Sequence, residues 1–499
     1  MKKQKIIILF LLCFALILLS FSCSGDNGEA DNPMIDGENA AFDGVSEDDI
    51  SIEADLDTPD LPDVDMDGKI FTILTAGWWG SEGWNSDVAP EEYNGEPVDD
   101  AGYERRIKIE QMYNVIINQI EEPSHSDAVN KYRTSILAGD GAYDAAITTC
   151  SDFASLLAGN YLTDFKELTY VDMDKPYWSR SFYDAMSIMG NHFGADGDIS
   201  VRRLKCTFIM AFNKSMIKDN GLESPYDLVK NGQWTFDKMI EMSKQIVRDL
   251  NGDGSMTRGD DVWGINYTSD TLMGIINSVG INLVETDSAG IPQLTAGTER
   301  NLSRLLRVYE DIVDESHSVN TLFSAGGATT GLADTDIFAD NRNLFLAGAS
   351  HLVPLLREIE LDFGIIPYPK WDAAQEQYIA STAGNYHPVL SVPMTNTDLD
   401  NTSIILEAMA YEGRKTIRPL FYENLLKTKT ARDEESAEII DYIFSNIIYD
   451  KGNMYNFGEM LGTFGYTMST NMNANIVSLI ESNTPVWQGA IDNLINATE

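Results

Sequence analysis

The chain has 499 residues and a mass of 55.4 kDa, and its 78 Asp and Glu against 35 Lys and Arg give a net charge of −43. This charge argues against nucleic acid as a partner, because a phosphate backbone needs a basic face, and against an anionic membrane surface. At about 150 residues per domain, the length allows two to four domains. Four cysteines are too few for a disulfide scaffold, and the five histidines have no zinc-site spacing.

The amino-terminal segment has the organisation of a signal peptide. Lys2, Lys3 and Lys5 precede an unbroken apolar run over residues 6–19. That run is shorter than the roughly 20 residues that a membrane-spanning helix needs. We therefore predict an exported protein with a signal peptide over residues 1–23.

The end of this segment, Ser20-Phe21-Ser22-Cys23, resembles a bacterial lipoprotein signal. The resemblance implies that Cys23 carries the lipid as the first residue of the mature protein, which is anchored at the extracellular face of the cytoplasmic membrane. In one departure, Leu19 stands four places before the cysteine, where the family usually has a leucine at three. The alternative is ordinary cleavage near Ser22.

Residues 24–67 form an acidic leader. They contain 16 Asp and Glu and no Lys or Arg. Such a segment cannot bury enough apolar surface to offset its chain entropy. We predict a disordered acidic linker between the lipid anchor and the folded body, and give less weight to a role in cation capture.

The folded body begins with alternating strand and helix patterns. Apolar, β-branched runs predict strands at 69–74, 115–117 and 143–147, and helical periodicity appears at 103–114, 128–137 and from 153 to 158. This order predicts an α/β layer with a largely parallel sheet. Later strands are predicted at 206–212 and 362–366, with helices between them and over most of the last hundred residues.

Short motifs follow in a characteristic order over most of residues 69–450: NGEPVDDA at 94–101, LTDF at 162–165, DKPYW at 174–178, GQWTFDKM at 232–239 and FGIIPYPK at 363–370. Together they resemble the sugar-binding group (family 1) of extracellular solute-binding proteins of bacterial ABC importers. The stretches around Trp234-Thr235 and over 364–370 are the most specific.

The resemblance implies a two-lobed periplasmic-binding-protein-like α/β fold (type II) with a ligand cleft between the lobes. In that family the chain crosses between the lobes three times. We place the crossings near Phe212, at 341–343 and at 386–392. The lobes expected from this are 69–212 plus 343–388 for lobe 1, and 213–342 plus 389–499 for lobe 2.

A cleft for sugars needs aromatic platforms beside carboxylates and amides. Trp78, Trp79, Glu82 and Trp84 lie in a polar, Gly-rich stretch after the first strand. In the family, this loop faces the cleft, and we expect these four residues to bind ligand. The alternative is local packing of the three tryptophans within the lobe.

Four further residues are candidates for the ligand site. Asp144 lies in a predicted strand, near the end where open α/β sheets bind ligands, although it could instead be a turn or capping residue. Asp198 is a loop carboxylate before the first crossing, and its alternative is a plain turn residue. Tyr386 and His387 stand at the third crossing, where they could close over ligand. His387, taken alone, is more typical of a structural histidine.

A calcium-loop spacing occurs over residues 249–260. Oxygen side chains fall at loop positions 1, 3, 5, 9 and 12, Gly254 stands at position 6, and the backbone carbonyl serves at position 7. The expected ligands are Asp249, Asn251, Asp253, Ser255, Thr257 and Asp260. The loop resembles those of dockerins, in which Asp at the last position is normal, but a dockerin has two such loops. We expect a structural calcium at this loop or, alternatively, an Asx-rich turn without metal.

Two cysteines remain in the body. Cys150 follows one predicted strand and Cys206 opens another. They could form a disulfide outside the cell, or remain two separate buried thiols, which is the interpretation we favour.

The function expected from the resemblance is capture of a sugar or oligosaccharide for an ABC importer. The partners are then the ligand and the permease subunits, with no nucleic acid. The chain lacks the phosphate-binding motif GxxxxGK[ST], so any ATPase must be a separate subunit. We expect no enzymatic activity and no cofactor apart from the structural calcium, because no nucleophile elbow or catalytic Cys/His signature occurs. The alternatives are a surface carbohydrate-active enzyme, or an adhesin or solute sensor without transport.

Overall fold

The computed structural model describes residues 58–77, 85–313, 317–321, 335–356, 359–426, 434–471 and 473–498. All of them belong to one compact unit, which covers residues 40–499. The predicted signal peptide, Cys23 and most of the predicted linker lie outside the described residues. None of the described helices is both long enough and apolar enough to span a membrane.

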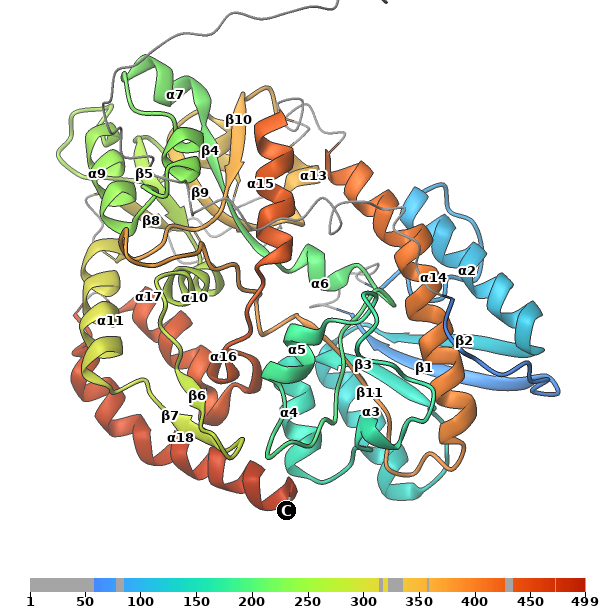
Figure 1. The fold of residues 1–499 in the computed structure, drawn as a ribbon. Helices are drawn as coiled ribbons and strands as arrows, with labels where there is room; N and C mark the ends of the chain where they lie inside the picture. Colours follow the sequence, from blue (N-terminus) through green and yellow to red (C-terminus); the bar gives the residue numbers. More distant parts are fainter. Residues whose placement is uncertain are drawn as a thin grey trace, which may run out of the picture. The chain divides into compact units, whose positions relative to one another are not determined.

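A four-stranded sheet forms the first lobe, in the order β11-β3-β1-β2 (Figure 1). Its members are β1 (Lys69–Ala76), β2 (Val115–Glu122), β3 (Ala145–Thr149) and β11 (Pro388–Ser391). The central strand β1 runs parallel to both β2 and β3, as the sequence predicts, and β11 pairs antiparallel with β3. The carboxyl ends of β1, β2 and β3 therefore meet at one edge of the sheet.

The helices of this lobe are α2 (Pro97–Tyr113), α3 (His125–Ala138), α4 (Cys150–Ala158) and α14 (Leu399–Leu426). The first three are predicted from the sequence, but each starts earlier than its apolar pattern, because polar residues make the first turn. Ser124 caps α3 by accepting the backbone N–H of Asp127, and Thr149 caps α4 by accepting that of Asp152. Helix α14 packs along α2.

A five-stranded mixed sheet forms the second lobe, in the order β10-β4-β9-β5-β8. Its members are β4 (Phe208–Asn213), β5 (Trp263–Tyr267), β8 (Ser318–Asn320), β9 (Asn343–Ala349) and β10 (Phe363–Ile366). Strand β4 pairs antiparallel with β9 and β10, whereas β5 runs parallel to β8 and β9. Trp234 is fully buried in this lobe and donates its indole N–H to the Pro367 carbonyl at 2.9 Å.

The main helices around the second sheet are α9 (Phe236–Ile246), α10 (Ser269–Ser278), α11 (Glu299–Ile312) and α15 (Glu434–Ser445). Shorter elements connect the lobes or lie at their surfaces: η1 (Phe165–Glu167), α5 (Arg180–Ala185), α6 (Arg202–Lys205), α7 (Lys214–Asp219), α8 (Pro225–Lys230), β6 (Val284–Thr286), β7 (Pro292–Leu294), α12 (Asp336–Ala339) and α13 (Leu352–Leu356).

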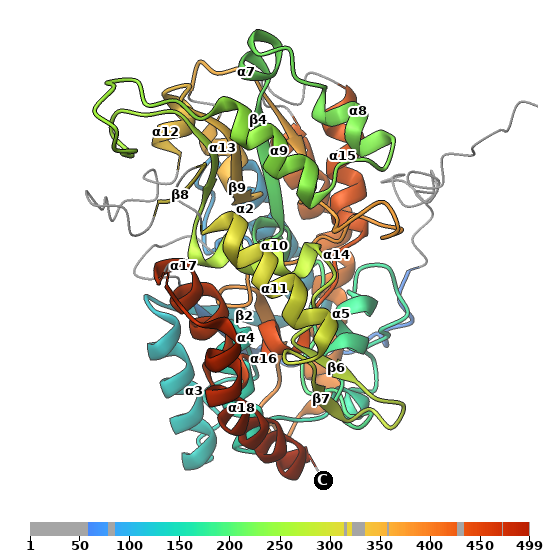
Figure 2. The ribbon, with the colours of Figure 1, turned by 90° about the vertical axis from the view of Figure 1, so that its left-hand side faces the viewer.

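The last segment of the chain contacts both lobes. It contains α16 (Lys451–Tyr455), η3 (Phe457–Glu459), the π-helix η4 (Gly462–Thr467), α17 (Met468–Thr470) and α18 (Ile476–Thr498). Helices α16 and α18 contact α4 of the first lobe, whereas η4 packs against α10 of the second (Figure 2). Together they form a wall that both lobes share.

The predicted division into lobes needs a correction at the second crossing. Residues 343–388 were expected in lobe 1, yet β9 and β10 hydrogen-bond with β4 in the second sheet. Residues 389–391 were expected in lobe 2, yet they belong to β11 in the first sheet. No crossing occurs at 341–343, because β9 joins the same sheet as β5. The chain instead returns from the first lobe to the second along α14. At the end of this helix, Tyr422 contacts Phe444 of α15 with 5.4 Å between ring centroids.

The first crossing lies at α6, slightly before Phe212, since Phe212 is already within β4. A crossing also lies between β10 and β11, at the position predicted near Tyr386, but it leads from the second lobe to the first, whereas the prediction had it leading from lobe 1 to lobe 2. We keep the name third crossing for this segment.

The carboxyl-terminal part of the predicted linker packs on the first lobe. Met66 is buried and its backbone N–H donates to the Tyr113 carbonyl at 2.8 Å. Leu61 and Val64 contact the apolar cluster that contains Phe71 and Ile73. The prediction of a disordered linker up to residue 67 is therefore wrong for residues 58–67. The apolar side chains of Leu61, Val64 and Met66 are enough to hold this short segment against the lobe.

Cys150 and Cys206 are both buried and free. They form no disulfide with each other, in agreement with the interpretation of two separate buried thiols that we favour from the sequence. Burial raises the pKa of each thiol, to about 12 for Cys206.

Candidate functional site

A cavity of about 760 Å³ lies between the lobes. The first lobe contributes the start of α3 and residues along α4 from Ser151 to Ala158, and the second contributes the start of α10. The shared wall contributes η3, η4 and α18. The cavity thus opens at the carboxyl ends of β3 and β5, which is where open α/β sheets bind ligands.

On the first lobe, a histidine and an aspartate form a pair at the cavity. Nδ1 of His125 lies 3.0 Å from Oδ2 of Asp152, and the Thr149 hydroxyl donates to the same oxygen at 2.8 Å. The hydrogen bond to Asp152 raises the pKa of His125. His125 begins α3 and Asp152 lies in the first turn of α4, so two strand-to-helix connections bring the pair together.

On the second lobe, Asp270 is held in place by the third crossing. Asn385 donates its amide to Oδ1 of Asp270 at 2.9 Å, and the Tyr386 hydroxyl donates to Oδ2 at 3.3 Å. Tyr386 is buried, and this burial places the pKa of its hydroxyl well above the usual value. The predicted ligand residue Tyr386 therefore acts on the cavity through Asp270.

The shared wall has two unusual backbone features. Asn456, Gly458 and Glu459 have left-handed φ values of 46°, 53° and 66°. Non-glycine residues in this conformation cost energy and cluster at ligand sites. The following turn is the π-helix η4, and such turns also concentrate at functional sites.

This wall supplies the aromatic side chains of the cavity. Tyr455 and Phe457 stack with 5.4 Å between their ring centroids, and Tyr466 of η4 is 53% exposed. The sequence motifs did not predict this segment as part of the site. The signal available was the glycine-rich stretch with four aromatic residues at 455–466, which matches none of the motifs named in the sequence.

The predicted residues Trp78, Trp79, Glu82 and Trp84 lie outside the described residues. The structure does describe the residues on either side of this segment, which follows β1. Asn85 donates its side-chain amide to the Ala76 carbonyl at 2.8 Å, and Arg202 Nη1 donates to the same carbonyl at 2.9 Å. Because β1 runs parallel to β3, this connection starts at the sheet edge that faces the cavity.

Asp144 lies at the opposite end of the sheet, so its predicted position is wrong. It immediately precedes β3, and its Oδ2 accepts the backbone N–H of Thr72 at 2.8 Å. Lys69 at the start of β1 lies 3.8 Å away. Burial raises the pKa of Asp144. The strand starts two residues later than its pattern begins, which places the carboxylate at the amino end.

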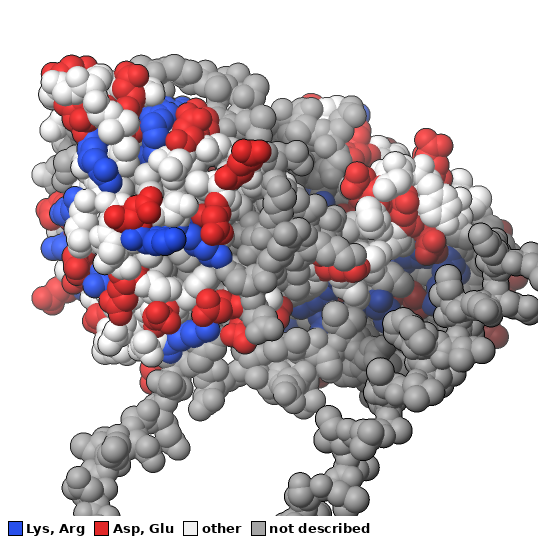
Figure 3. Space-filling model, turned by 90° about the horizontal axis from the view of Figure 1, so that it is seen from above, with Lys and Arg blue, Asp and Glu red and all other residues white. Residues whose placement is uncertain are grey.

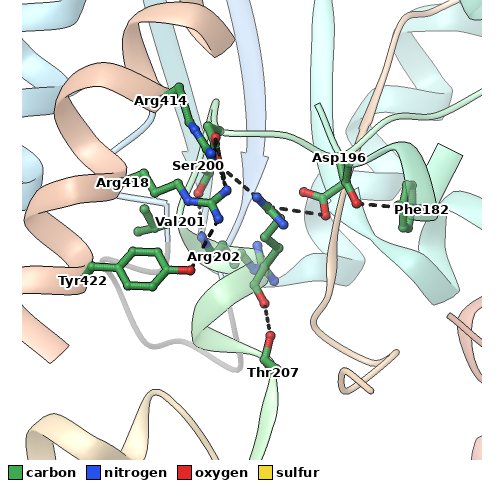
Figure 4. A network of polar contacts seen from close by, with 12 residues as sticks. Phe182, Asp196, Ser200, Val201, Arg202, Thr207, Arg414, Arg418 and Tyr422 are labelled. Atoms are coloured by element: carbon green, nitrogen blue, oxygen red, sulfur yellow. Dashed lines mark hydrogen bonds and ion pairs between the residues drawn. The ribbon is translucent and has the colours of Figure 1, made fainter. Parts of the chain in front are cut away.

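Asp198 does not line the cavity either, because arginines enclose it. Its side chain is 2% exposed and accepts from Arg203 at 2.9 Å, Arg418 at 3.2 Å and Arg414 at 3.4 Å. Figure 4 shows Arg414 and Arg418 reaching across from α14 toward this segment. Burial alone would raise the pKa of Asp198, but Arg418, Arg203 and Arg414 together hold it below its usual value.

His387 is a structural histidine, the alternative considered above. It is fully buried and stacks on Phe182 with 5.2 Å between ring centroids. Its Nε2 lies 3.4 Å from Asp196, and its backbone carbonyl accepts the N–H of Cys150. The side chain therefore packs the third crossing against the first lobe and cannot reach a ligand.

The 249–260 loop is built from Asx turns. Asp249 accepts the backbone N–H groups of Gly252 and Gly254 at 2.6 and 2.8 Å, and both glycines have left-handed φ values. Buried Asp261, just beyond the predicted ligands, accepts the N–H groups of Leu250 and Thr257. Across the described part of the chain, no three His, Cys, Asp or Glu side chains are grouped as a metal site would require.

Several solved structures share this fold. An ABC substrate-binding protein from Listeria monocytogenes in complex with cycloalternan is 12% identical with a TM-score of 0.52, over 87% of this chain and 99% of that one. An ABC transporter solute-binding protein from Thermotoga lettingae, bound with α-D-tagatose, is 14% identical with a TM-score of 0.52, over 86% and 100%. The maltose/maltodextrin-binding domain MalE from Bdellovibrio bacteriovorus, bound to maltotriose, is 11% identical with a TM-score of 0.52, over 85% and 100%.

No family model and no curated protein matches the sequence. The chain nevertheless has the two-lobed α/β fold of the solute-binding proteins of ABC importers. The predicted fold class and the resemblance in fold to that group are thereby confirmed.

Proposed function

We propose that the protein captures a sugar or oligosaccharide and delivers it to the permease of an ABC importer. The cavity carries this proposal, because it lies between the two lobes at strand ends and combines the exposed ring of Tyr466 with carboxylates and amides. Sugar rings offer apolar faces to aromatic side chains and hydroxyl rims to polar groups. The similar structures, described above with cycloalternan, tagatose and maltotriose, support the same class of ligand.

A thermal-shift screen of the mature chain against mono- and oligosaccharides tests the proposal. A ligand that binds only the folded state raises Tm by mass action, so at least one sugar should raise it in a concentration-dependent way. Analysis of the sugar after the assay separates the alternatives. Unchanged sugar supports capture, consumed sugar indicates a carbohydrate-active enzyme, and no shift with any carbohydrate contradicts the proposal.

Tyr466 should contribute directly to sugar binding. Tyr466→Ala removes an exposed ring from the cavity, and we expect about a tenfold loss of affinity for the sugar found in the screen, by calorimetry. Tyr466→Phe keeps the ring and should retain most of the affinity. Tyr93→Ala is a matched control, because Tyr93 is 58% exposed and does not line the cavity. Equal effects of the Tyr466→Ala and Tyr93→Ala substitutions would contradict the assignment.

We also propose that Cys23 carries a lipid that anchors the protein at the extracellular face of the cytoplasmic membrane. The support is the apolar run followed by this cysteine. We expect the wild-type chain in the membrane fraction and a Cys23→Ser variant as precursor or released protein. Mass spectrometry of the mature amino terminus checks the modification. An unmodified amino terminus after cleavage near Ser22 would support the ordinary signal peptide instead.

The calcium loop stays a prediction, and we propose that it binds one structural ion. The proposal is based on the spacing of oxygen side chains over residues 249–260. Calorimetry on chelator-treated protein should show calcium binding with a Kd on the order of 10⁻³ M or tighter. The double substitution Asp249→Asn and Asp253→Asn should abolish this heat. Absence of calcium heat at millimolar concentration in the wild type would leave the metal-free Asx turn.

A further inference from the structure

The cavity wall over residues 455–466 is distinguished by its shape and not by its charge. Acidic and basic side chains are interspersed on the described part of the face in Figure 3, so charge singles out no binding surface on that face. The wall contains three glycines, Gly458, Gly462 and Gly465, and the first two line the cavity. The fold requires glycine at two of these three positions, and Gly462 is the exception.

The backbone accounts for Gly458 and Gly465. Gly458 has a left-handed φ of 53°, a conformation that favours glycine. A Cβ atom at Gly465 would lie 2.9 Å from the Ser269 carbonyl oxygen, which is closer than real Cβ contacts. Only glycine therefore lets η4 pack this closely against α10.

No comparable reason applies to Gly462. Its φ is not left-handed, and Leu461 before η4 and Met468 after it have helical backbone angles. Among the described residues, a Cβ atom here would meet only the Glu459 side chain, whose two nearest atoms are 3.9 Å away. Glycine inside a helix costs stability relative to alanine, because it loses more backbone freedom on folding. The chain thus carries an unfavourable residue at a position where the fold would accept alanine.

The open space at Gly462 belongs to the same face of the wall as the ring of Tyr466. The two residues are four apart in η4, and residues at this spacing are neighbours on the surface of a helical turn. Both line the cavity, and Tyr466 is exposed. A glycine beside an exposed aromatic ring leaves a slot, which we define by Gly462 and Tyr466, and a larger side chain at 462 would project into it.

We propose that Gly462 is a ligand-binding position, where one pyranose ring of the sugar lies over the glycine backbone with an apolar face on the ring of Tyr466. This inference rests on the proposed function and deepens it, because it names the part of the ligand that the slot holds. Stacking on an aromatic side chain needs close approach of the two rings. A methyl group at position 462 would hold the sugar ring away from Tyr466.

The test is Gly462→Ala, with Gly489→Ala as the matched control. Gly489 is a half-buried glycine of α18 that does not line the cavity, and a Cβ atom there would meet no described atom within 4 Å. Both substitutions should raise the Tm of the sugar-free mature chain, because alanine is the better helix former. The thermal-shift screen includes maltotriose, cellotriose and tagatose. With the sugar that gives its largest shift, calorimetry should show about a tenfold loss of affinity for Gly462→Ala and no loss for Gly489→Ala.

A double substitution then assigns the loss to the slot. If Gly462 and Tyr466 hold the same sugar ring, Gly462→Ala should weaken binding much less in a Tyr466→Ala background than in the wild type. An equal loss in both backgrounds overturns this inference, as does unchanged affinity or a lowered sugar-free Tm in the single Gly462→Ala variant. Each of these results leaves sugar capture standing. Failure of every carbohydrate in the screen overturns both this inference and the proposed function.

Discussion

Replacing Asp198 with alanine should lower the free energy of unfolding by about 3–5 kcal/mol, because it removes the carboxylate that three arginines share. The side chain is 2% exposed, and Arg203 is nearly as buried, at 8%. Removing one partner of a buried ion pair leaves the remaining charges desolvated without compensation. Urea denaturation of both proteins at neutral pH measures the difference.

Asp174 provides a matched control for this substitution. It pairs with Arg180, but its side chain is 80% exposed, so solvent screens the pair. We expect Asp174→Ala to change the free energy of unfolding by less than about 1 kcal/mol. An effect of Asp198→Ala no larger than that of the control would show that the arginine cluster does not depend on this carboxylate.

The same cluster of Asp198 and its arginines should make the free energy of unfolding depend on pH. The arginines lower the pKa of Asp198 in the folded state, so its contribution to stability is fully present above the unfolded value of about 4. The contribution is lost as the pH falls below that value through the folded pKa. Asp198→Asn lacks this titration, and its stability should therefore fall less steeply with acid than that of the wild type.

Replacing Arg202 with methionine should cost on the order of 3 kcal/mol of stability and also weaken binding of the proposed sugar ligand. The guanidinium is fully buried and donates to the carbonyls of Ala76 and Tyr386 at 2.9 and 3.0 Å. It also donates to the Asn85 side chain at 3.1 Å. The substitution leaves three buried acceptors without this donor. It also removes the hydrogen bond that fixes the backbone of Tyr386, and the Tyr386 hydroxyl in turn holds Asp270 at the cavity.

Urea denaturation and sugar calorimetry on the Arg202→Met variant measure the two effects. Arg300→Met is a suitable control, because Arg300 is exposed on α11. It should change neither stability nor affinity appreciably. Full sugar affinity in a folded Arg202→Met variant would show that the crossing is positioned by other contacts.

The sequence predicts the elements of this fold better than their placement. The β-branched runs at 69–74 and 206–212 are strands in the structure, since local pattern decides local structure. The sheet to which a strand belongs depends on distant partners, and the pattern of residues 343–349 does not reveal that they pair with β4. The lobe assignment of residues 343–388 failed for this reason.

The candidate site shows the same limit. Asp198 has the appearance of a loop carboxylate, and the arginines that enclose it from α14 lie 216 and 220 residues away in sequence. Asp144 was placed at the wrong end of its strand because strand boundaries carry a weak sequence signal. The cavity wall over 455–466 depends on left-handed residues and a π-helix, which short motifs do not reveal.

The pairing of β11 with β3 has a consequence for the order in which the protein can fold. Leu390 of β11 pairs with Ile147 of β3, so the first sheet is incomplete until almost four-fifths of the chain has been synthesised. Strand β4 likewise cannot pair until β9 and β10 have been synthesised. Such distant pairings make folding slow, because long loops must close before the contacts form. An emerging chain therefore stays without a finished lobe for most of its synthesis, which would suit the export in an unfolded form that the amino-terminal segment predicts.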